Sequence, residues 1–270
     1  MKLSQNLKLA IDAAIQAGKK IIEIYNSDDF NLEYKLDDSP LTIADTASNK
    51  IIENILEASN IPILSEEGNI LDFNNRKNLK HLWVVDPLDG TKEFIKKNNE
   101  FTINVSLIEN SVPMIGVIYA PALNVLYFSE KKLGAYKVFI TNLDEFDHSN
   151  ALRLPLVKKF KEYKVLTSRS HLNDNTLDYI DNLKVNNLKV VSVPMGSSLK
   201  FCLLAEGLAD CYPRFSPCME WDTAAGHAIL NAAGGAVVHF DTLRPLEYGK
   251  PNYENPHFIA SVEGVMLKNK

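Results

Sequence analysis

Between residues 61 and 128 the chain is a succession of short apolar segments joined by turns, and this pattern limits its fold more than any other feature. The segments predict five strands, over residues 61–64, 82–85, 101–108, 114–119 and 125–128. Only turn residues such as Asn110 and Pro121 separate the last three. Strands that follow so closely pair in antiparallel fashion, because a parallel pair needs a long crossover. The sequence therefore predicts an antiparallel sheet in its first half.

Helical patterns lie before this sheet and in the second half of the chain. Apolar residues recur at helical spacing over 3–25 and 45–58, and Asp45 stands where the N-cap of the second helix is expected. From about residue 163 the pattern alternates, with strands expected at 164–167, 189–193, 209–212 and 236–240 and helices at 173–183, 197–206 and 221–233. Because the stretch 142–155 is polar and rich in turn residues, we predict an α+β half over residues 1–145 and an α/β half over residues 146–270.

The composition is that of a folded protein without bulk affinity for polyanions. Hydrophobic residues make up 46% and charged residues 23% of the 270 positions, which excludes a disordered chain or a collagen-like fibre. The formal net charge of −5 argues against binding a nucleic acid polymer through overall charge. An anionic ligand would have to be held locally, by bound metal ions or helix termini.

Cysteine usage and hydropathy predict a cytoplasmic protein. No apolar run approaches the ~20 residues that cross a bilayer, and the N-terminus lacks the apolar core of a signal peptide. Cys202, Cys211 and Cys218 are odd in number and form no C-x-x-C pair, so neither a disulfide framework nor a zinc site is expected. Reduced thiols in a cytoplasm follow from this.

The most informative motif is residues 83–94, Trp-Val-Val-Asp-Pro-Leu-Asp-Gly-Thr-Lys-Glu-Phe. An apolar strand runs into Asp86 and Asp89, and Pro87 is expected to fix a turn between them. Gly90 permits a tight backbone path, after which Thr91 can open a short helix. The free N–H groups at a helix start favour an anion.

Two carboxylates beside a bound phosphate make sense only if cations lie between them. Oxygens of Asp86, Asp89 and the Leu88 carbonyl are hard ligands of the kind that Mg²⁺ prefers. The alternative is that Asp86 and Asp89 are ordinary turn residues.

Two further acidic groups bear on that choice. Glu66 and Glu67 follow the apolar segment 61–64, and Asp222 stands at the head of an Ala-rich helix. Taken singly, the Glu pair is typical of a solvated surface, and Asp222 of a carboxylate that serves a helix dipole. Together, three acidic groups at the ends of apolar elements favour one shared metal site.

The order of these motifs resembles a known superfamily over essentially the whole chain. Asp45, Glu66-Glu67, the segment 86–91 and Trp221-Asp222 are similar to the Mg²⁺-dependent, lithium-sensitive phosphatases of the inositol monophosphatase superfamily. Within it, the segments 89–95, 167–171, 196–202 and 212–215 resemble the bacterial 3′(2′),5′-bisphosphate nucleotidases.

This resemblance implies a fold and an activity. The fold would be a layered α/β/α/β/α sandwich of the inositol monophosphatase and fructose-1,6-bisphosphatase type. The activity would be hydrolysis of the 3′-phosphate of adenosine 3′,5′-bisphosphate to AMP and phosphate, with a related activity on 3′-phosphoadenylyl sulfate, in sulfate assimilation. The protein would be a monomer or a homodimer. Some relatives rest loosely on the cytoplasmic face of the inner membrane, but an acidic chain gives that location no physical support.

The resemblance also implies the site residues. Two to three Mg²⁺ ions would be held by Glu66, Glu67, Asp86, the Leu88 carbonyl, Asp89 and Asp222, with Glu67 near a third, weakly held ion. Asp45 and the Thr91 hydroxyl would orient and deprotonate the attacking water. Substrate would be bound by Glu66, Leu88, Asp89, Gly90, Thr91, His171, Ser197, Ser198, Lys200, Arg214 and Asp222.

The substrate side of the site has competing interpretations. Ser197, Ser198 and Lys200 at a helix start could hold a second phosphate or a ribose, or could be a helix cap beside an exposed lysine. Arg169 and His171 could face the nucleotide.

Three other functions stay open at this point. They are inositol monophosphate hydrolysis, a fructose-bisphosphatase-like activity and a non-catalytic scaffold that binds phosphate or metal. Residues 92–94 and 196–200 argue against the inositol phosphate reading.

Overall fold

Seven strands form the larger of two main sheets in the computed structural model, which describes residues 1–27, 32–35, 40–68, 72–143, 146–156, 162–170, 172–185 and 189–262. In sheet order the strands are β3 (Ile63–Ser65), β4 (His81–Asp89), β5 (Thr102–Glu109), β6 (Val112–Ala120), β7 (Val125–Glu130), β8 (Gly134–Phe139) and β9 (Leu152–Arg153). Every neighbouring pair is antiparallel except β3 and β4, which run parallel. The predicted antiparallel sheet is thus confirmed for all but its first strand.

The second sheet has five strands and mixed direction. Its order is β11 (Val190–Met195), β10 (Tyr163–Ser168), β12 (Cys211–Arg214), β14 (Phe258–Ser261) and β13 (Ala236–His239). β10 is parallel to both β11 and β12, whereas β14 is antiparallel to its two neighbours. A small separate ribbon pairs β1 (Glu33–Tyr34) with β2 (Pro40–Leu41).

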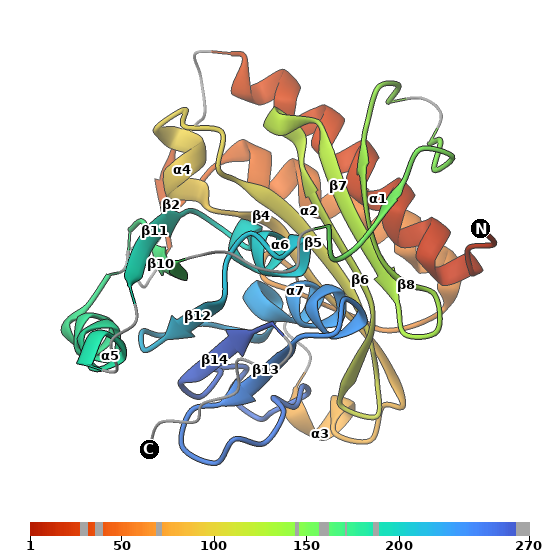
Figure 1. Cartoon of the computed structure of the whole chain (residues 1–270). Coiled ribbons are helices and arrows are strands. Elements are labelled where there is room, and N and C mark those ends of the chain that lie inside the picture. Colours follow the sequence, from red (N-terminus) through yellow and green to blue (C-terminus); the bar gives the residue numbers. More distant parts are fainter. Residues whose placement is uncertain are drawn as a thin grey trace.

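Helices complete a five-layer arrangement (Figure 1). α1 (Gln5–Tyr25) and α2 (Ile43–Leu56) cover one face of the seven-stranded sheet, and α6 (Leu199–Glu206) and α7 (Glu220–Ala232) lie between the two sheets. α5 (Asp174–Val185) packs on β11 and β12 of the second sheet. Short α3 (Phe73–Arg76) and α4 (Thr91–Ile95) and two single-turn 3₁₀ helices, Glu57–Ser59 and Pro121–Leu123, complete the described elements. The α/β/α/β/α sandwich is confirmed.

Two apolar cores bind these layers together. One fills the space between α1, α2 and the seven-stranded sheet, with Trp83, Phe94 and Tyr119 among its largest buried side chains. The other joins that sheet to α6, α7 and the second sheet, where Phe201 and Phe258 are buried. Because the second core draws on both sheets, burial of apolar surface fixes the two sheets against each other.

Two local expectations are wrong. The N-cap of α2 is Thr42, and Asp45 lies three residues later. The two residues form a capping box: the Thr42 side chain accepts a backbone N–H of the first turn, and the Asp45 side chain accepts the backbone N–H of Thr42. Pro87 does not turn the chain: β4 continues through it to Asp89, with a register shift against β5 between Asp86 and Asp89. A β-bulge therefore stands where a turn was expected.

Five strands, β1, β2, β8, β9 and β14, add to those the sequence predicted. β9 lies beyond residue 145 yet pairs with β8, so the first sheet draws on residues from both predicted halves. The division at residues 145 and 146 stays a prediction. None of the helices in the described ranges is both long and apolar enough to cross a membrane.

Candidate active site

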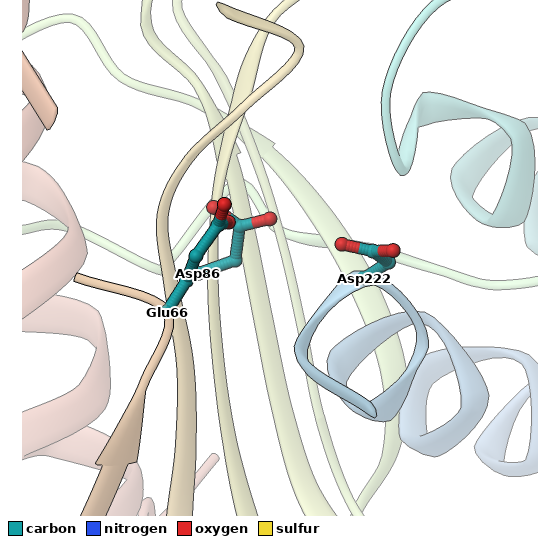
Figure 2. Close-up of side chains that lie close together, drawn as sticks. All are labelled: Glu66, Asp86 and Asp222. Carbon is teal, nitrogen blue, oxygen red and sulfur yellow. The ribbon is translucent and has the colours of Figure 1, made fainter. Parts of the chain in front are cut away.

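The carboxylates predicted to hold metal come together where two parallel strands end. Glu66 follows β3 directly, and Asp86 lies on β4, whose Val85 pairs with Ser65 of β3. Asp222 lies in the first turn of α7, between the sheets. One carboxylate oxygen from each of Glu66, Asp86 and Asp222 lies within 4.8 Å of the other two. Figure 2 shows the three side chains, with Asp222 on a helix across from Glu66 and Asp86. Three distant segments thus build one carboxylate cluster.

The bulge in β4 holds the Asp86 carboxylate in place. Asp86 Oδ1 accepts a hydrogen bond from the backbone N–H of Leu88 at 3.0 Å. The hydroxyl of Ser48 on α2 donates to the carbonyl oxygen of Pro87 at 2.7 Å. The one extra residue of the bulge changes the direction of the side chains here, while β4 stays paired with β5 on either side.

Burial and mutual repulsion disfavour the ionised form of these acids. Asp86 is 1% exposed, and burial, reinforced by Glu66, Asp89 and Asp222, raises its pKa well above the usual range. Burial likewise raises the pKa of Glu66 to about 8 and that of Asp89 to about 7, with the charge of Asp222 adding to each. A site of this kind binds either protons or cations. Its oxygen-only donor set fits Mg²⁺.

Lys35 supplies one positive charge at the rim of this cluster. Its ammonium lies 2.7 Å from Glu66 Oε1 and also pairs with Glu67. The two carboxylates raise the pKa of Lys35, although burial opposes them. Sequence reasoning missed this residue, because nothing in the local pattern around it signals a contact with residues 66 and 67.

Asp45 and Thr91, the predicted catalytic pair, are in contact. The Thr91 hydroxyl donates to Asp45 Oδ1 at 3.1 Å and lies 3.3 Å from the carbonyl oxygen of Leu88. The other oxygen, Asp45 Oδ2, accepts the backbone N–H of Thr42 at 2.8 Å and its hydroxyl at 2.6 Å. Burial raises the pKa of Asp45 to about 6, and these hydrogen bonds limit the rise. Asp45 therefore stays a base at neutral pH.

Asp89 connects the cluster to α6. The side-chain amide of Asn104 on β5 donates to Asp89 Oδ2 at 3.3 Å, and Asn104 Oδ1 accepts the Ser198 hydroxyl at 2.6 Å. Ser198 also shares a 2.8 Å hydrogen bond with Thr102. The Ser198 hydroxyl thus forms hydrogen bonds within the protein, and its contact with substrate stays a prediction. Asn104, which sequence reasoning did not single out, holds Asp89 and Ser198 together.

A cavity of about 360 Å³ opens beside the carboxylates. It is lined by most of the predicted site residues: Glu66, Asp86, Leu88, Asp89, Gly90, Thr91, Ser197, Ser198, Lys200, Arg214 and Asp222. Gly90 caps α4 with a φ of 91°, a conformation that glycine adopts at little cost. Asp45 lies behind Thr91. His171 lies outside the described residues.

The basic residues near the cavity differ in what they bind. The Lys200 ammonium donates to the carbonyls of Ser197 at 2.6 Å and Met195 at 3.1 Å, and burial lowers its pKa to about 8. Lys200 is only 4% exposed, so the alternative interpretation, in which it is an exposed lysine beside a helix cap, is wrong. Arg169 pairs with Glu100 at 2.6 Å. Arg214 Nη2 donates to the Pro217 carbonyl at 2.8 Å, whereas its buried Nε has no acceptor among the described residues.

Known proteins match the chain along nearly its full length. Residues 2–265 match the inositol monophosphatase family. A 3′(2′),5′-bisphosphate nucleotidase CysQ from Buchnera aphidicola is 45% identical over 83% of this chain and 80% of its own, and that from Escherichia coli K12 is 39% identical over 92% and 96%.

Solved structures agree with these relatives. The crystal structure of CysQ from Bacteroides thetaiotaomicron, a bacterial member of the same family, superposes with a TM-score of 0.88 at 47% identity, over 96% of this chain and 97% of that one. A Thermotoga maritima inositol monophosphatase, at 23% identity and a TM-score of 0.76 over 96% and 92% of the two chains, shares the fold. This chain belongs to the inositol monophosphatase family.

Proposed function

We propose that the protein is a Mg²⁺-dependent 3′(2′),5′-bisphosphate nucleotidase that hydrolyses adenosine 3′,5′-bisphosphate to AMP and phosphate. The observation that carries this is a single cavity lined both by the Glu66, Asp86 and Asp222 carboxylates and by the cationic side chains of Lys200 and Arg214. Such a cavity suits a substrate with one phosphate to be cleaved over metal and a second anionic group to be held. The CysQ relatives from Buchnera aphidicola and Escherichia coli K12 are named as 3′(2′),5′-bisphosphate nucleotidases.

The carboxylates are suited to hold the metal. Glu66, Asp86, Asp89, Asp222 and the Leu88 carbonyl would provide its ligands, with Glu67 near a more weakly held ion, for two to three Mg²⁺ in all. When bound, Mg²⁺ supplies Lewis-acid stabilisation of charge on the phosphoryl oxygens. The raised pKa values of Glu66 and Asp89 fit this assignment, because a bound cation relieves the repulsion that causes them.

Asp45 and Thr91 would handle the proton of the attacking water. The Thr91 hydroxyl already donates to Asp45 Oδ1, so a water that donates to the Thr91 oxygen can pass its proton along this contact to the carboxylate. The capping box holds Asp45 Oδ2 with two hydrogen bonds, which fixes the direction of the other oxygen. As the water oxygen bonds to phosphorus, the bond from phosphorus to the 3′ oxygen breaks, and that oxygen leaves as the ribose hydroxyl after it takes up a proton.

The rest of the cavity would hold the phosphate and the nucleoside. Backbone N–H groups of Gly90 and Thr91, at the start of α4, are suited to the scissile phosphate. The guanidinium of Arg214, whose Nε finds no acceptor among the described residues, is suited to the second phosphate. Lys200 would act mainly through its charge and by holding the Ser197 carbonyl, and His171 remains a predicted contact to the base.

Phosphate release with Mg²⁺ from adenosine 3′,5′-bisphosphate, inositol 1-phosphate and fructose 1,6-bisphosphate tests this proposal. We expect a preference for the nucleotide of about a hundredfold in kcat/KM, ~2.7 kcal/mol in the transition state. A preference for inositol 1-phosphate would overturn the substrate assignment. Release from none of the three, with Asp89→Asn as inert as the wild type, would indicate a non-catalytic scaffold.

We also propose a cytoplasmic location. The supporting observation is that Cys202, Cys211 and Cys218 are all free and buried.

A further inference from the structure

Two loops leave the second sheet beside the cavity: the second lines it, and the first follows a strand, β10, whose last residue lines it. β10 and β11 run parallel, with Ser168 paired to Met195, so the loops that follow them leave the sheet at the same edge. These are residues 169–170 and 196–198, which we call the paired loops. Ser168 and residues 196–198 line the cavity. Ligands of open α/β sheets bind at such an edge.

Two carboxylates from the first half of the chain, Glu93 and Glu100, hold the paired loops. Glu93 on α4 accepts the Ser170 hydroxyl at 2.6 Å. Glu100, just before β5, accepts Arg169 Nε at 2.7 Å and Nη2 at 2.6 Å. Its Oε2 also accepts the backbone N–H of Gly196 at 2.7 Å. Each of the paired loops is thus bonded to a residue that follows the 86–91 motif in the chain.

Packing at Gly196 shows how closely the two acids hold the second loop. A Cβ atom there would lie 2.8 Å from Cγ of Glu93 and 2.9 Å from Cβ of Glu100. Both distances are too short for any side chain, so Gly196 is packed directly against both acids. Glu93 is only 5% exposed, and a carboxylate buried to this degree needs its hydrogen-bond partner.

We propose that Glu93 and Glu100 are positioning residues that set specificity for a nucleotide by fixing the paired loops where they meet the part of the substrate beyond the scissile phosphate. The inference rests on the proposed nucleotidase function. Their contacts go to Arg169, Ser170 and Gly196, so their effect belongs to binding of the nucleotide rather than to the metal. This assigns a role to Glu93, the central residue of the 92–94 segment.

The test compares KM and kcat for adenosine 3′,5′-bisphosphate, with the Mg²⁺ concentration that gives half-maximal activity as a third readout. Glu93→Ala and Ser170→Ala each remove the same hydrogen bond, from opposite partners. We expect each to raise KM about tenfold, with kcat and the Mg²⁺ requirement within about twofold of wild type, and the double variant to lose no more than either one. Glu93→Gln keeps an acceptor oxygen for Ser170 and should restore most of the affinity.

A matched control uses the other end of the same strands. Glu162 and Lys189 form an ion pair at 2.5 Å where β10 and β11 begin, away from the cavity. Glu162→Gln should leave all three readouts unchanged. The inference is overturned if Ser170→Ala leaves KM unchanged, or if kcat and the Mg²⁺ requirement change together with KM. A wild type that releases phosphate from inositol 1-phosphate but not from the nucleotide overturns the proposed function itself, and the inference with it.

Discussion

Two carboxylates at the start of α7, the buried Glu220 and the half-buried Asp222, have opposite surroundings. Glu220 is 0% exposed and accepts three hydrogen bonds, from the backbone N–H groups of Gly249 at 2.8 Å and Lys250 at 2.7 Å and from the Lys250 ammonium at 2.8 Å. Two residues later, Asp222 shares its surroundings with the carboxylates of Glu66 and Asp86. One acid is neutralised by the protein, whereas the other faces further negative charge.

The difference separates what stabilises the fold from what serves the function. A buried carboxylate with a full set of donors repays its desolvation, while a cluster of carboxylates without them costs stability. Glu220 fixes the segment 249–250 to the first turn of α7, and so holds the backbone from which Asp222 extends. On the proposed function, the cluster is kept despite this cost because a cation completes it.

The largest expected effect is on catalysis at the cluster. Asp86→Asn should lower Mg²⁺-dependent phosphate release from adenosine 3′,5′-bisphosphate by roughly a thousandfold, ~4 kcal/mol, because one ligand and its charge are lost. Residual activity near the wild-type level would show that Asp86 is not part of the metal site.

The next effect is on stability at Glu220. Glu220→Gln should lower the free energy of unfolding by about 2 kcal/mol, because hydrogen bonds to a charged acceptor become bonds to a neutral one. Urea denaturation measures this. The exposed pair of Lys20 and Glu23, 2.9 Å apart, provides the control: Glu23→Gln should leave the free energy of unfolding essentially unchanged, because water screens an exposed ion pair. An equal loss of unfolding free energy in Glu220→Gln and Glu23→Gln would show that the hydrogen bonds to Glu220 do not stabilise the fold.

Asp45 is an intermediate case, since it is buried but accepts two hydrogen bonds from Thr42. Its raised pKa of about 6 means that the carboxyl takes up a proton as the pH falls through 6 and can then no longer accept one from water. Bound Mg²⁺ lowers this pKa, so at saturating Mg²⁺ kcat should fall by up to about tenfold per pH unit below an ionisation at or under pH 6. A kcat that shows no such fall on the acid side would contradict the role of Asp45 as the base.

The smallest effect is the acid sensitivity of the helix that carries both Glu220 and Asp222. His227 Nδ1 lies 3.0 Å from the Tyr248 hydroxyl, and burial lowers the pKa of His227 to about 3. Between about pH 3 and pH 6.5, the histidine is protonated in the unfolded chain but stays neutral in the folded protein. Stability should fall below about pH 6.5 by up to ~1.4 kcal/mol per unit from this group, and His227→Gln should reduce that slope.

The sequence predicts the acids of the site well because each has a local signal. Glu66, Asp86 and Asp222 each stand at or near the end of an apolar element, and such ends converge in layered folds. The capping box of α2 was also readable, since Thr42 precedes Asp45 by three residues. The prediction that Asp45 is the N-cap is wrong because Thr and Asp are both common N-cap residues, and Thr42 takes that position.

Contacts between distant segments could not be predicted. Lys35 reaches Glu66 across 31 positions, and Asn104 meets Ser198 across 94, with no local pattern at either end. β14 has four residues, and β8 alternates buried and partly exposed side chains irregularly, so neither gives a clear strand signal. The hydrogen-bond partners of Ser198 and Lys200 could not be predicted for the same reason, since most of them lie far away in the sequence or depend on the fold.

Thermal unfolding with and without Mg²⁺, for the wild type and Asp86→Asn side by side, tests the central claim most directly. Without metal, the variant should unfold at the same or a higher temperature, because it lacks a buried carboxyl whose raised pKa costs stability at neutral pH. Mg²⁺ at a hundred times its Kd should stabilise the wild type by about 2.7 kcal/mol and the variant far less. A variant that is less stable without metal, or that gains as much from Mg²⁺ as the wild type, would contradict the claim that this cluster is kept for a cation.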